Sequence, residues 1–347
     1  MKQEIIDKIN RLASQDEPFL FVINYQGDKA FIRLLSDINP EECLFDFEGR
    51  GNLSHVWKET LKEGTSETTW QIEPPLYEDY ERSFNIVKSN IMAGNSYLTN
   101  LTCKVPVSCN LSLEAIFHRA KGKYKLLLRR SESLTPFVCF SPETFVRIKN
   151  GRIYSYPMKG TLDASLPNAE KQLMEDRKEA AEHATIVDLI RNDLSRVAED
   201  VRVDKYRYID VLHTNKGDIL QTSSEISGRL PEDYPHHLGE ILDAQLPAGS
   251  ITGAPKDKTM QIIQEAEGYD RGFYTGIMGI YDQGELNSAV MIRFIEEETS
   301  PVDFEADGEK NFKAGGGITS KSDCRKEYEE VIQKIYLPIQ ENPSSEY

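Results

Sequence analysis

An Asn-Gly pair, Asn150-Gly151, constrains the fold of this 347-residue chain more than any other short stretch. A two-residue hairpin turn needs a positive φ at both central residues, and Asn-Gly adopts that geometry readily. Residues 143–149 and 152–156, on either side of the pair, are rich in aromatic and β-branched side chains. The pattern predicts an antiparallel hairpin in which Lys149 lies opposite Arg152.

The register of this hairpin also places Glu143 opposite Met158, so that Lys159 lies within one residue of Glu143. Pro157 cannot donate a hydrogen bond to the ladder, and we therefore expect a bend or a bulge beside it. A glutamate and a lysine brought together in this way form either a surface ion pair or a pair that takes part in chemistry. Spacing alone leaves both alternatives open.

A second feature is the glycine-rich stretch at residues 246–256, LPAGSITGAPK, which precedes a predicted helix. Gly249 and Gly253 let backbone N–H groups approach a ligand closely, and Ser250 and Thr252 add hydroxyl groups. A loop that leads into a helix N-terminus presents unpaired N–H groups, which suits an anion. The stretch lacks the Gly-Lys-Ser/Thr ending of a Walker loop, so that class is excluded. A capped turn without a ligand is the alternative.

The formal net charge of −16 argues against nucleic acid or an anionic membrane surface as a partner. An anionic small molecule would need locally concentrated positive groups or a bound cation. The first residues form a charged amphipathic segment, and no apolar run approaches the ~20 residues of a membrane span, so we expect a cytoplasmic protein. The five cysteines form no CxxC pair, which indicates reduced thiols: Cys43, Cys103, Cys109, Cys139 and Cys324.

Hydrophobic periodicity and turn residues predict an N-terminal segment, residues 1–75, packed on a larger domain of residues 76–347. The N-terminal segment contains a hairpin that turns at residues 26–28 and a turn-rich polar stretch at 39–69. The expected helices are 77–92, 113–121, 168–194, 239–245, 257–266 and a last one capped by Ser322 or Asp323. The other expected strands are 97–107, 126–130, 137–140, 201–211, 219–230, 276–281, 286–295 and 311–313.

Charged residues inside the predicted elements are candidate functional residues. Arg293 lies within an apolar strand pattern, where a buried guanidinium would require a carboxylate partner. The helix predicted at 168–194 carries a charged face with Glu175, Glu179 and Glu182. A solvated face is the usual explanation for glutamates in such an arrangement.

The final helix has an apolar stripe with Glu327 and Glu330 one turn apart beside it. The stripe has the i, i+3, i+4, i+7 spacing of a buried helical face and consists of Tyr328, Val331, Ile332 and Ile335. Glutamates at the edge of a stripe are either rim charges or ligands aimed into a cleft. Hard oxygen ligands of this kind suit Mg²⁺.

Four motifs together give the chain a family likeness: MKGT at 158–161, IVDLIRNDLSRVA at 186–198, GSITGAPK at 249–256, and AGGGI at 314–318 followed by EYEE at 327–330. In order and approximate spacing they resemble the chorismate-utilising enzymes, among them anthranilate synthase component I, isochorismate synthase and salicylate synthase. The likeness covers most of residues 77–337 and is greatest to the aminodeoxychorismate synthase component I branch. The resemblance implies an α+β fold of two stacked, mostly antiparallel β-sheets with helices outside.

The resemblance also implies roles for individual residues. Lys159 matches a lysine assigned to covalent attack on C2 of chorismate in the aminodeoxychorismate branch, and to activation of water in the isochorismate branch. Glu143 matches the general acid that assists departure of the C4 hydroxyl. The implied Mg²⁺ ligands are Glu182 and Glu330, with Glu327 beside them. The matching substrate-binding groups are Gly249, Ser250, Thr252, Tyr274, Arg293, Gly315, Gly316 and Gly317.

Gln221 lies where anthranilate synthases carry a histidine, so the resemblance argues against that activity, and the amide is expected to hydrogen-bond substrate. No cysteine lies between glycines, as the nucleophile of a glutaminase typically does. Ammonia is therefore expected from solution or from a separate glutaminase subunit. The leading hypothesis is Mg²⁺-dependent amination of chorismate at C4, towards 4-aminobenzoate and folate. Isochorismate synthase, which adds water at C2, and a chorismate-binding regulatory paralogue are the alternatives.

Overall fold

The computed structural model describes residues 1–53, 68–129, 134–214, 217–298 and 308–339. The chain forms two compact units, and each unit is assembled from three separate stretches of sequence. Unit 1 comprises Met1–Ser36, Thr144–Ile251 and Gly276–Val290, and unit 2 comprises Asp37–Glu143, Thr252–Thr275 and Met291–Tyr347. Each unit contains one β-sheet of its own.

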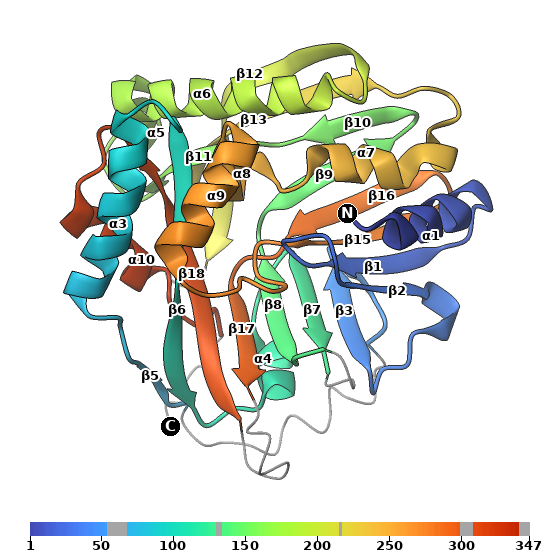
Figure 1. Ribbon diagram of the computed structural model, residues 1–347, viewed down its shortest axis with the longest axis horizontal. Coiled ribbons are helices and arrows are strands. Elements are labelled where there is room, and N and C mark those ends of the chain that lie inside the picture. Colours follow the sequence, from blue (N-terminus) through green and yellow to red (C-terminus); the bar gives the residue numbers. More distant parts are fainter. Residues whose placement is uncertain (54–67, 130–133, 215–216, 299–307, 340–347) are drawn as a thin grey trace. The chain divides into compact units, whose positions relative to one another are not determined.

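Unit 1 is built on an antiparallel sheet of nine strands, counted over the described residues (Figure 1). The order across the sheet is β11 (Met158–Asp163), β13 (Gly217–Arg229), β10 (Arg152–Ser155), β9 (Thr144–Lys149), β16 (Glu285–Val290), β15 (Ile277–Asp282), β1 (Phe19–Ile23) and β2 (Ala30–Leu34). The ninth strand, β12 (Glu199–Thr214), forms a long hairpin with β13. All five residues of β1 are apolar and buried, which fits a strand in the interior of a sheet.

Two predicted hairpins are confirmed in unit 1. Lys149 lies opposite Arg152 across the Asn150-Gly151 turn, in which both residues have a positive φ. Strands β1 and β2 are joined through the turn at residues 26–28, as the sequence pattern predicts. In both cases the local turn chemistry was sufficient to set the pairing.

The prediction that Glu143 lies opposite Met158 is wrong. Strand β10 ends at Ser155, and Pro157, which has no N–H group to donate, follows in the connection. Strand β11 then pairs with β13, where Met158 lies opposite Ser223. The chain thus leaves the β9–β10 ladder at the proline and continues along β13.

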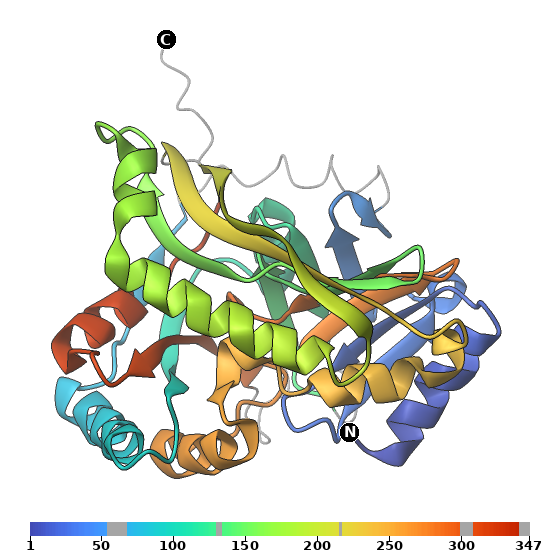
Figure 2. The same ribbon diagram turned by 90° about the horizontal axis from the view of Figure 1, so that it is seen from above.

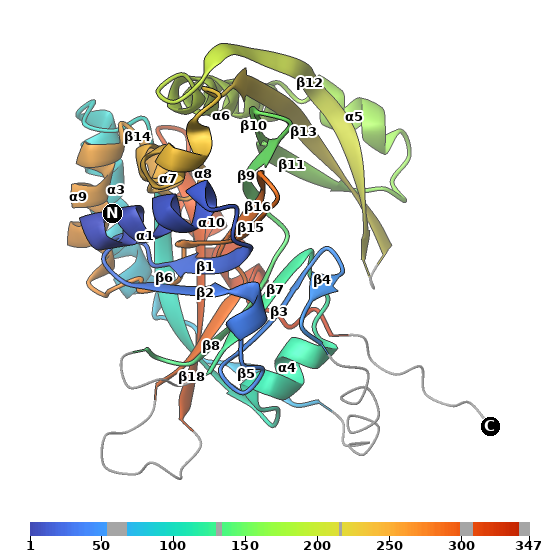
Figure 3. The same cartoon turned by 90° about the vertical axis from the view of Figure 1, so that its right-hand side faces the viewer.

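Helices α5 (Ala169–Glu175) and α6 (Arg177–Leu194) pack on β11 and β13, and α6 also runs along β12 (Figure 2). Figure 3 shows α5 against the β12–β13 hairpin. The prediction of one helix over residues 168–194 is wrong, because Asp176 interrupts it. The Asp176 side chain accepts hydrogen bonds from the N–H groups of Lys178 and Glu179, and so caps α6 as a new helix.

Helices α1 (Gln3–Ser14) and α7 (Leu238–Gln245) of unit 1 pack closely against each other. A Cβ at Gly239 would lie 2.6 Å from the carbonyl oxygen of Ile6, so a larger residue would force the two helices apart. Within the part of the chain that the structure describes, no helix has both the length and the apolar character needed to cross a membrane.

Unit 2 has a second antiparallel sheet, also of nine strands over the described residues. Its order is β14 (Gly253–Ala254), β6 (Leu98–Cys109), β18 (Glu309–Thr319), β17 (Phe294–Glu298), β8 (Phe137–Ser141), β7 (Tyr124–Leu128), β3 (Cys43–Phe47) and β4 (Arg50–Gly51), with β5 (Trp70–Ile72) paired to β6. Helices α3 (Tyr77–Met92), α9 (Lys256–Glu267) and α10 (Cys324–Gln333) pack against β6 or β18, and α4 (Leu113–Arg119) packs against β7 and β8.

The helices of unit 2 follow the sequence signals closely. Helix α3 has the predicted bounds, 77–92, and the φ of Gly94 just beyond its end is 76°. Asp323 caps α10 by accepting a hydrogen bond from the N–H group of Lys326. The apolar face of α3, with Phe84 and Val87, joins Val331 of α10 in one buried cluster.

Three further predictions need correction. The region 39–69 is not turn-rich throughout, because β3 forms at Cys43–Phe47 and pairs with β7; part of this region lies outside the described residues. The strand predicted at 286–295 ends at Val290, and Arg293 lies in the connection before β17. The glycine run at 314–317 is not a loop but the middle of β18, paired along β6.

These observations confirm the α+β class with two antiparallel sheets and helices. Strands of the first 72 residues pair within both sheets, β1 and β2 in one and β3 to β5 in the other. The division into residues 1–75 and 76–347 remains a prediction.

Candidate functional site

The predicted site residues divide between the two units. Unit 1 carries Lys159, Glu182, Gln221, Gly249 and Ser250. Unit 2 carries Glu143, Thr252, Tyr274, Arg293, Gly315, Gly316, Gly317, Glu327 and Glu330. Each group is described within its own unit.

Lys159 of unit 1 lies on β11 beside a break in the strand register. Lys159 pairs with Thr222 of β13, and the register shifts between Lys159 and Thr161. Gly160, within the shift, has a φ of 69°, a conformation that glycine adopts without strain. The Thr222 hydroxyl donates a hydrogen bond to the Lys159 carbonyl oxygen. This bulge therefore fixes the backbone that carries the lysine.

Glu182 of α6 lies between two lysines. Its Oε2 is 4.0 Å from Nζ of Lys159, and its Oε1 is 3.8 Å from Nζ of Lys178. The side chains of Lys159 and Glu182 are 32% and 26% exposed, so a ligand can reach both from solvent. Ion pairs of this length and exposure contribute little to stability, about 0–1 kcal/mol. The structure thus brings together two residues that the sequence resemblance assigns to one reaction.

Glu179, one helical turn before Glu182, is a neighbour that the sequence analysis assigned to a solvated face. It is half-buried, and a Cβ at Gly160 would lie 3.0 Å from its Oε2. Burial raises the pKa of Glu179, and the Glu182 carboxylate raises it further, while Lys159 and Lys178 oppose both effects. The i, i+3 spacing of the two glutamates was the available signal that they share a face.

His183 is a second residue that the sequence analysis did not select. Its side chain is fully buried, and Nε2 lies 2.6 Å from the Ser224 hydroxyl on β13. Burial, together with the positive charges of Arg207 and Lys159, lowers the pKa of His183 to about 4. The imidazole is therefore neutral at physiological pH.

Gln221 lies on β13 next to the register shift of β11. Its backbone pairs with Thr161 on one side and with Asp210 on the other. Its side-chain Oε1 is buried and has no hydrogen-bond partner within the described residues. A buried amide oxygen without a partner is costly, so this atom is available to a donor on a ligand.

Gly249 and Ser250 open a single helical turn, α8 (Gly249–Thr252), rather than an extended loop. A Cβ at Gly249 would lie 2.9 Å from Cδ2 of Leu189 on α6. Glycine at this position therefore permits close packing of the turn on the helix that carries Glu182.

In unit 2, helix α10 lies over the glycine run of β18. A Cβ at Gly316 would lie 3.7 Å from Oε2 of Glu327 and 3.8 Å from Nζ of Lys334. Lys334 donates to the Gly315 carbonyl oxygen at 3.1 Å and forms an ion pair with Glu330 at 2.8 Å. Lys334 was not selected from the sequence, although its i, i+4 spacing to Glu330 was a usable signal. Carboxylates and a cation of the α10 region thus lie against the glycine run of β18.

Arg293 adopts a φ of 56°, which is uncommon for a residue other than glycine. Its carbonyl oxygen accepts a hydrogen bond from the Phe140 N–H group at 3.2 Å, and its guanidinium lies 5.8 Å from the centre of the Tyr336 ring. Its position in a connection corrects the expectation of a buried strand residue. A strained residue of this kind persists only when its surroundings hold it, and such residues cluster at functional sites.

Tyr274 lies in a segment held by a buried ion pair. The Arg271 guanidinium donates to both carboxylate oxygens of Glu267, at 2.6 and 2.8 Å, and the Arg271 carbonyl accepts from the Tyr274 N–H group at 3.1 Å. Burial raises the pKa of the Tyr274 phenol. The Tyr274 side chain is therefore neutral, and its backbone is held in place.

Two further predicted residues of unit 2 differ in their environment. The Thr252 hydroxyl is buried and has no hydrogen-bond partner within the described residues. Glu143 is partly exposed at the end of β8, and its N–H group donates to the Ser141 hydroxyl at 3.1 Å. Their assigned roles remain predictions.

The predicted Mg²⁺ ligands are carboxylates, the donor type that this ion prefers. In the described part of the chain, no group of three or more His, Cys, Asp or Glu side chains is arranged to hold a metal ion. Glu182 is flanked by lysines in unit 1, whereas Glu327 and Glu330 belong to unit 2. The donor chemistry fits Mg²⁺, although the described residues of each unit contain no complete ligand set.

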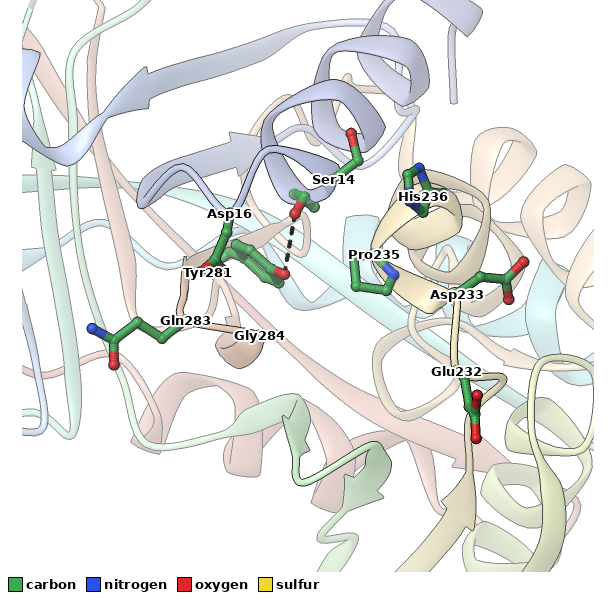
Figure 4. A pocket seen from close by; sticks show the side chains of 10 residues that line it. Ser14, Asp16, Glu232, Asp233, Pro235, His236, Tyr281, Gln283 and Gly284 are labelled. Atoms are coloured by element: carbon green, nitrogen blue, oxygen red, sulfur yellow. Dashed lines mark hydrogen bonds between the residues drawn. The ribbon is translucent and has the colours of Figure 1, made fainter.

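A separate concavity of about 530 Å³ lies in unit 1 near the C-terminal end of α1 (Figure 4). Its lining includes Asp16, Glu232, Asp233 and the ring of Tyr281, whose hydroxyl donates to the Ala13 carbonyl oxygen at 3.3 Å. None of the predicted site residues lines it.

A sequence profile described as chorismate binding enzyme matches residues 21–340. The chain belongs to the chorismate-binding enzyme family. Over 338 residues it is 47% identical to a protein named "Uncharacterized PabA-like protein" from Haemophilus influenzae, with 97% of each chain covered. Over 269 residues it is 30% identical to aminodeoxychorismate synthase component 1 of Salmonella typhimurium, covering 74% of this chain and 56% of that one.

Solved structures agree with the family at the level of the fold. The crystal structure of anthranilate synthase component I from Streptococcus pneumoniae TIGR4 superposes with a TM-score of 0.63 at 24% sequence identity. The match covers 81% of this chain and 63% of that one. The fold of this chain is therefore the fold of a solved chorismate-utilising enzyme.

The packing of Glu179 on Gly160 predicts a difference between two glycine variants. Gly160 and Gly151 share a φ of 69°, so alanine at either carries the same strain, about 1–2 kcal/mol. Only at Gly160 would the new Cβ meet neighbours, Oε2 of Glu179 and Cδ1 of Leu173 at 3.2 Å. We expect Gly160→Ala to reduce chorismate turnover and Gly151→Ala to leave it near the wild-type rate, with urea unfolding as the measure of strain. Equal turnover in both variants would contradict a role for this packing.

Proposed function

We propose that this chain catalyses the amination of chorismate at C4, giving 4-amino-4-deoxychorismate, the activity of aminodeoxychorismate synthase component I. The observation that carries the proposal is Lys159 on the β11 bulge, with its amine 4.0 Å from Glu182. The resemblance assigns a lysine in this motif to the aminodeoxychorismate and isochorismate branches, and a glutamine to anthranilate synthases. Relatives named aminodeoxychorismate synthase component 1 support the same choice.

In the proposed reaction, the Lys159 amine attacks C2 of chorismate as the C4 hydroxyl departs. A hydroxyl leaves more easily when a proton donor assists it, and we assign this role to Glu143. Glu182 is close enough to Lys159 to hold the amine in place before attack. Ammonia then attacks C4 and the bond between Lys159 and C2 breaks, so that the ring double bonds return to their original positions and the lysine is released as a free amine. Gln221, with its buried unpartnered Oε1, is assigned to hydrogen-bonding of the substrate.

The substrate is a dicarboxylate, and its charge must be offset locally in a protein of net charge −16. We assign Mg²⁺ binding to Glu182 and Glu330, with Glu327 beside them. When bound, the ion would neutralise a substrate carboxylate and act as a Lewis acid. Other proposed contacts are Arg293 and Tyr274, the Thr252 hydroxyl, and the N–H groups of Gly249, Ser250, Gly315, Gly316 and Gly317.

The proposal includes a separate glutaminase partner as the source of ammonia. A glutaminase needs a nucleophilic cysteine, and the five cysteines of this chain do not suit that role. Burial raises the pKa values of all five thiols, so each is a poor nucleophile. With the partner, the product would enter 4-aminobenzoate and folate biosynthesis.

Product analysis tests the proposed reaction directly. The purified chain is incubated with chorismate, Mg²⁺ and ammonium, and the products are identified by mass spectrometry. We expect 4-amino-4-deoxychorismate as the main product and little anthranilate. Isochorismate as the main product would replace the proposal by the isochorismate synthase alternative. Chorismate that is bound but unchanged would indicate the regulatory paralogue.

Substitution of the proposed ligands, compared with substitution of nearby exposed glutamates, tests the metal assignment. Glu182→Gln and Glu330→Gln should each raise the Mg²⁺ concentration for half-maximal activity on the order of tenfold or more, because each removes a charged ligand. Glu175→Gln and Glu329→Gln are matched controls, since each of these exposed side chains pairs with a surface cation one helical turn away, and they should behave as wild type. Calorimetric titration of Mg²⁺ in the absence of chorismate provides a second readout. Wild-type Mg²⁺ affinity in both ligand variants would refute the assignment.

A further inference from the structure

Ser224 of β13 is a buried residue at which three other segments of unit 1 meet. Its side chain and backbone are fully shielded from solvent. The Ser224 N–H group donates to the Pro157 carbonyl oxygen at 3.0 Å. The Ser224 hydroxyl accepts from the Arg207 N–H group of β12 at 2.9 Å and lies 2.6 Å from Nε2 of His183 on α6. One residue thus links the start of β11, the bulged part of β12 and helix α6.

The segments joined at Ser224 carry the residues proposed for the reaction. Pro157 precedes Lys159 by two positions, and His183 directly follows Glu182. Lys159 is also held on its other side, because its carbonyl oxygen accepts from the Thr222 hydroxyl. Contacts of β13 therefore set both the strand that carries the lysine and the helix that carries the glutamate.

Arg207 extends the same arrangement to the start of α6. It has a φ of 46° and lies within a register shift of the β12–β13 hairpin. This bulge turns its N–H group toward Ser224, while its guanidinium donates to the carbonyl oxygens of Leu173 and Met174, each at 3.1 Å. Those carbonyls lie in the last turn of α5, just before the Asp176 cap. The bulge thereby fixes the junction from which α6 begins.

The hydrogen bonds of the His183 ring make the pair of Ser224 and His183 sensitive to substitution. An imidazole ring has two nitrogens that can take part in hydrogen bonds. Nε2 meets the Ser224 hydroxyl, whereas Nδ1 is buried without a partner within the described residues. The contact to Ser224 is therefore the hydrogen bond on which the ring orientation depends. Loss of the hydroxyl would free both His183 and the Arg207 N–H group.

We propose that Ser224 and His183 are a positioning pair that sets the separation of Lys159 from Glu182. Neither residue touches the reacting atoms in this role. Ser224 fixes the strand and His183 fixes the helix. The role rests on the proposed function only in so far as Lys159 and Glu182 are its reactive groups.

The first test compares two buried serines of the same strand. Ser224→Ala removes the shared hydroxyl, and Ser227→Ala removes a hydroxyl that bonds Asp204 and Arg152 instead. We expect Ser224→Ala to lower kcat by about 10- to 100-fold with a much smaller change in KM, as a displaced reactive group does. Ser227→Ala should keep wild-type kinetics at a similar unfolding midpoint.

A readout without substrate or metal separates this proposal from the proposed function. Limiting acetic anhydride labels lysine amines, and peptide mass spectrometry compares Lys159 with exposed Lys149 of the same unit. We expect relative labelling of Lys159 to rise several-fold in Ser224→Ala and to stay unchanged in Ser227→Ala. A wild-type chain that does not aminate chorismate would refute the proposed function and leave this comparison valid. Equal kcat and equal Lys159 labelling in the two variants would overturn the positioning pair.

Substitutions of His183 give an independent test that does not disturb β13. The terminal amide of glutamine can reach the position of Nε2, whereas asparagine reaches only the position of Nδ1. His183→Gln should therefore retain most of kcat and wild-type labelling of Lys159, while His183→Asn should behave like Ser224→Ala. Equal losses in both variants, accompanied by equal falls in the unfolding midpoint, would show that the residue only fills space.

Discussion

Strand β13 is the constraint on which unit 1 depends, because it pairs with three other strands. Residues 226–229 pair with β10 and residues 219–223 pair with β11, while β12 pairs along its other edge. The chain can pass from β10 to β11 along β13 only if it leaves the β9 ladder, and Pro157 lies at that point. Lys159 follows immediately, so the break that ends one ladder also sets the lysine backbone.

Local signals in the sequence were enough to predict several elements correctly. The Asn150-Gly151 turn set the β9–β10 register, and a glycine after Met92 ended α3 where expected. The break at Asp176 was missed because the helical pattern continues through it, and only the side-chain cap reveals a second helix start. The strand through the glycine run was missed because its pairing partner, β6, lies about 200 residues earlier in the sequence.

For the candidate site too, local sequence signals predict some features, whereas others depend on residues far apart in the sequence. Motifs identified the residue types, and i, i+4 spacing would have added Lys178 to Glu182 and Lys334 to Glu330. The environments of His183, Ser224 and Gln221 depend on strand pairing and burial, which no short stretch specifies. In this acidic protein each unit has a lysine beside a glutamate, and the proposed dianionic substrate would need positive charge of this kind.

The proposed function depends on covalent attack of Lys159 on chorismate, and mapping of the resulting adduct tests this step. The wild-type chain is incubated with chorismate and Mg²⁺ without ammonium, then digested and analysed by peptide mass spectrometry, with Lys159→Ala and Lys178→Ala as controls. We expect a mass increase on the Lys159 peptide that persists in Lys178→Ala and disappears when ammonium is added. An adduct on another lysine, or 4-amino-4-deoxychorismate formed at the wild-type rate by Lys159→Ala, would rule out covalent attack by Lys159.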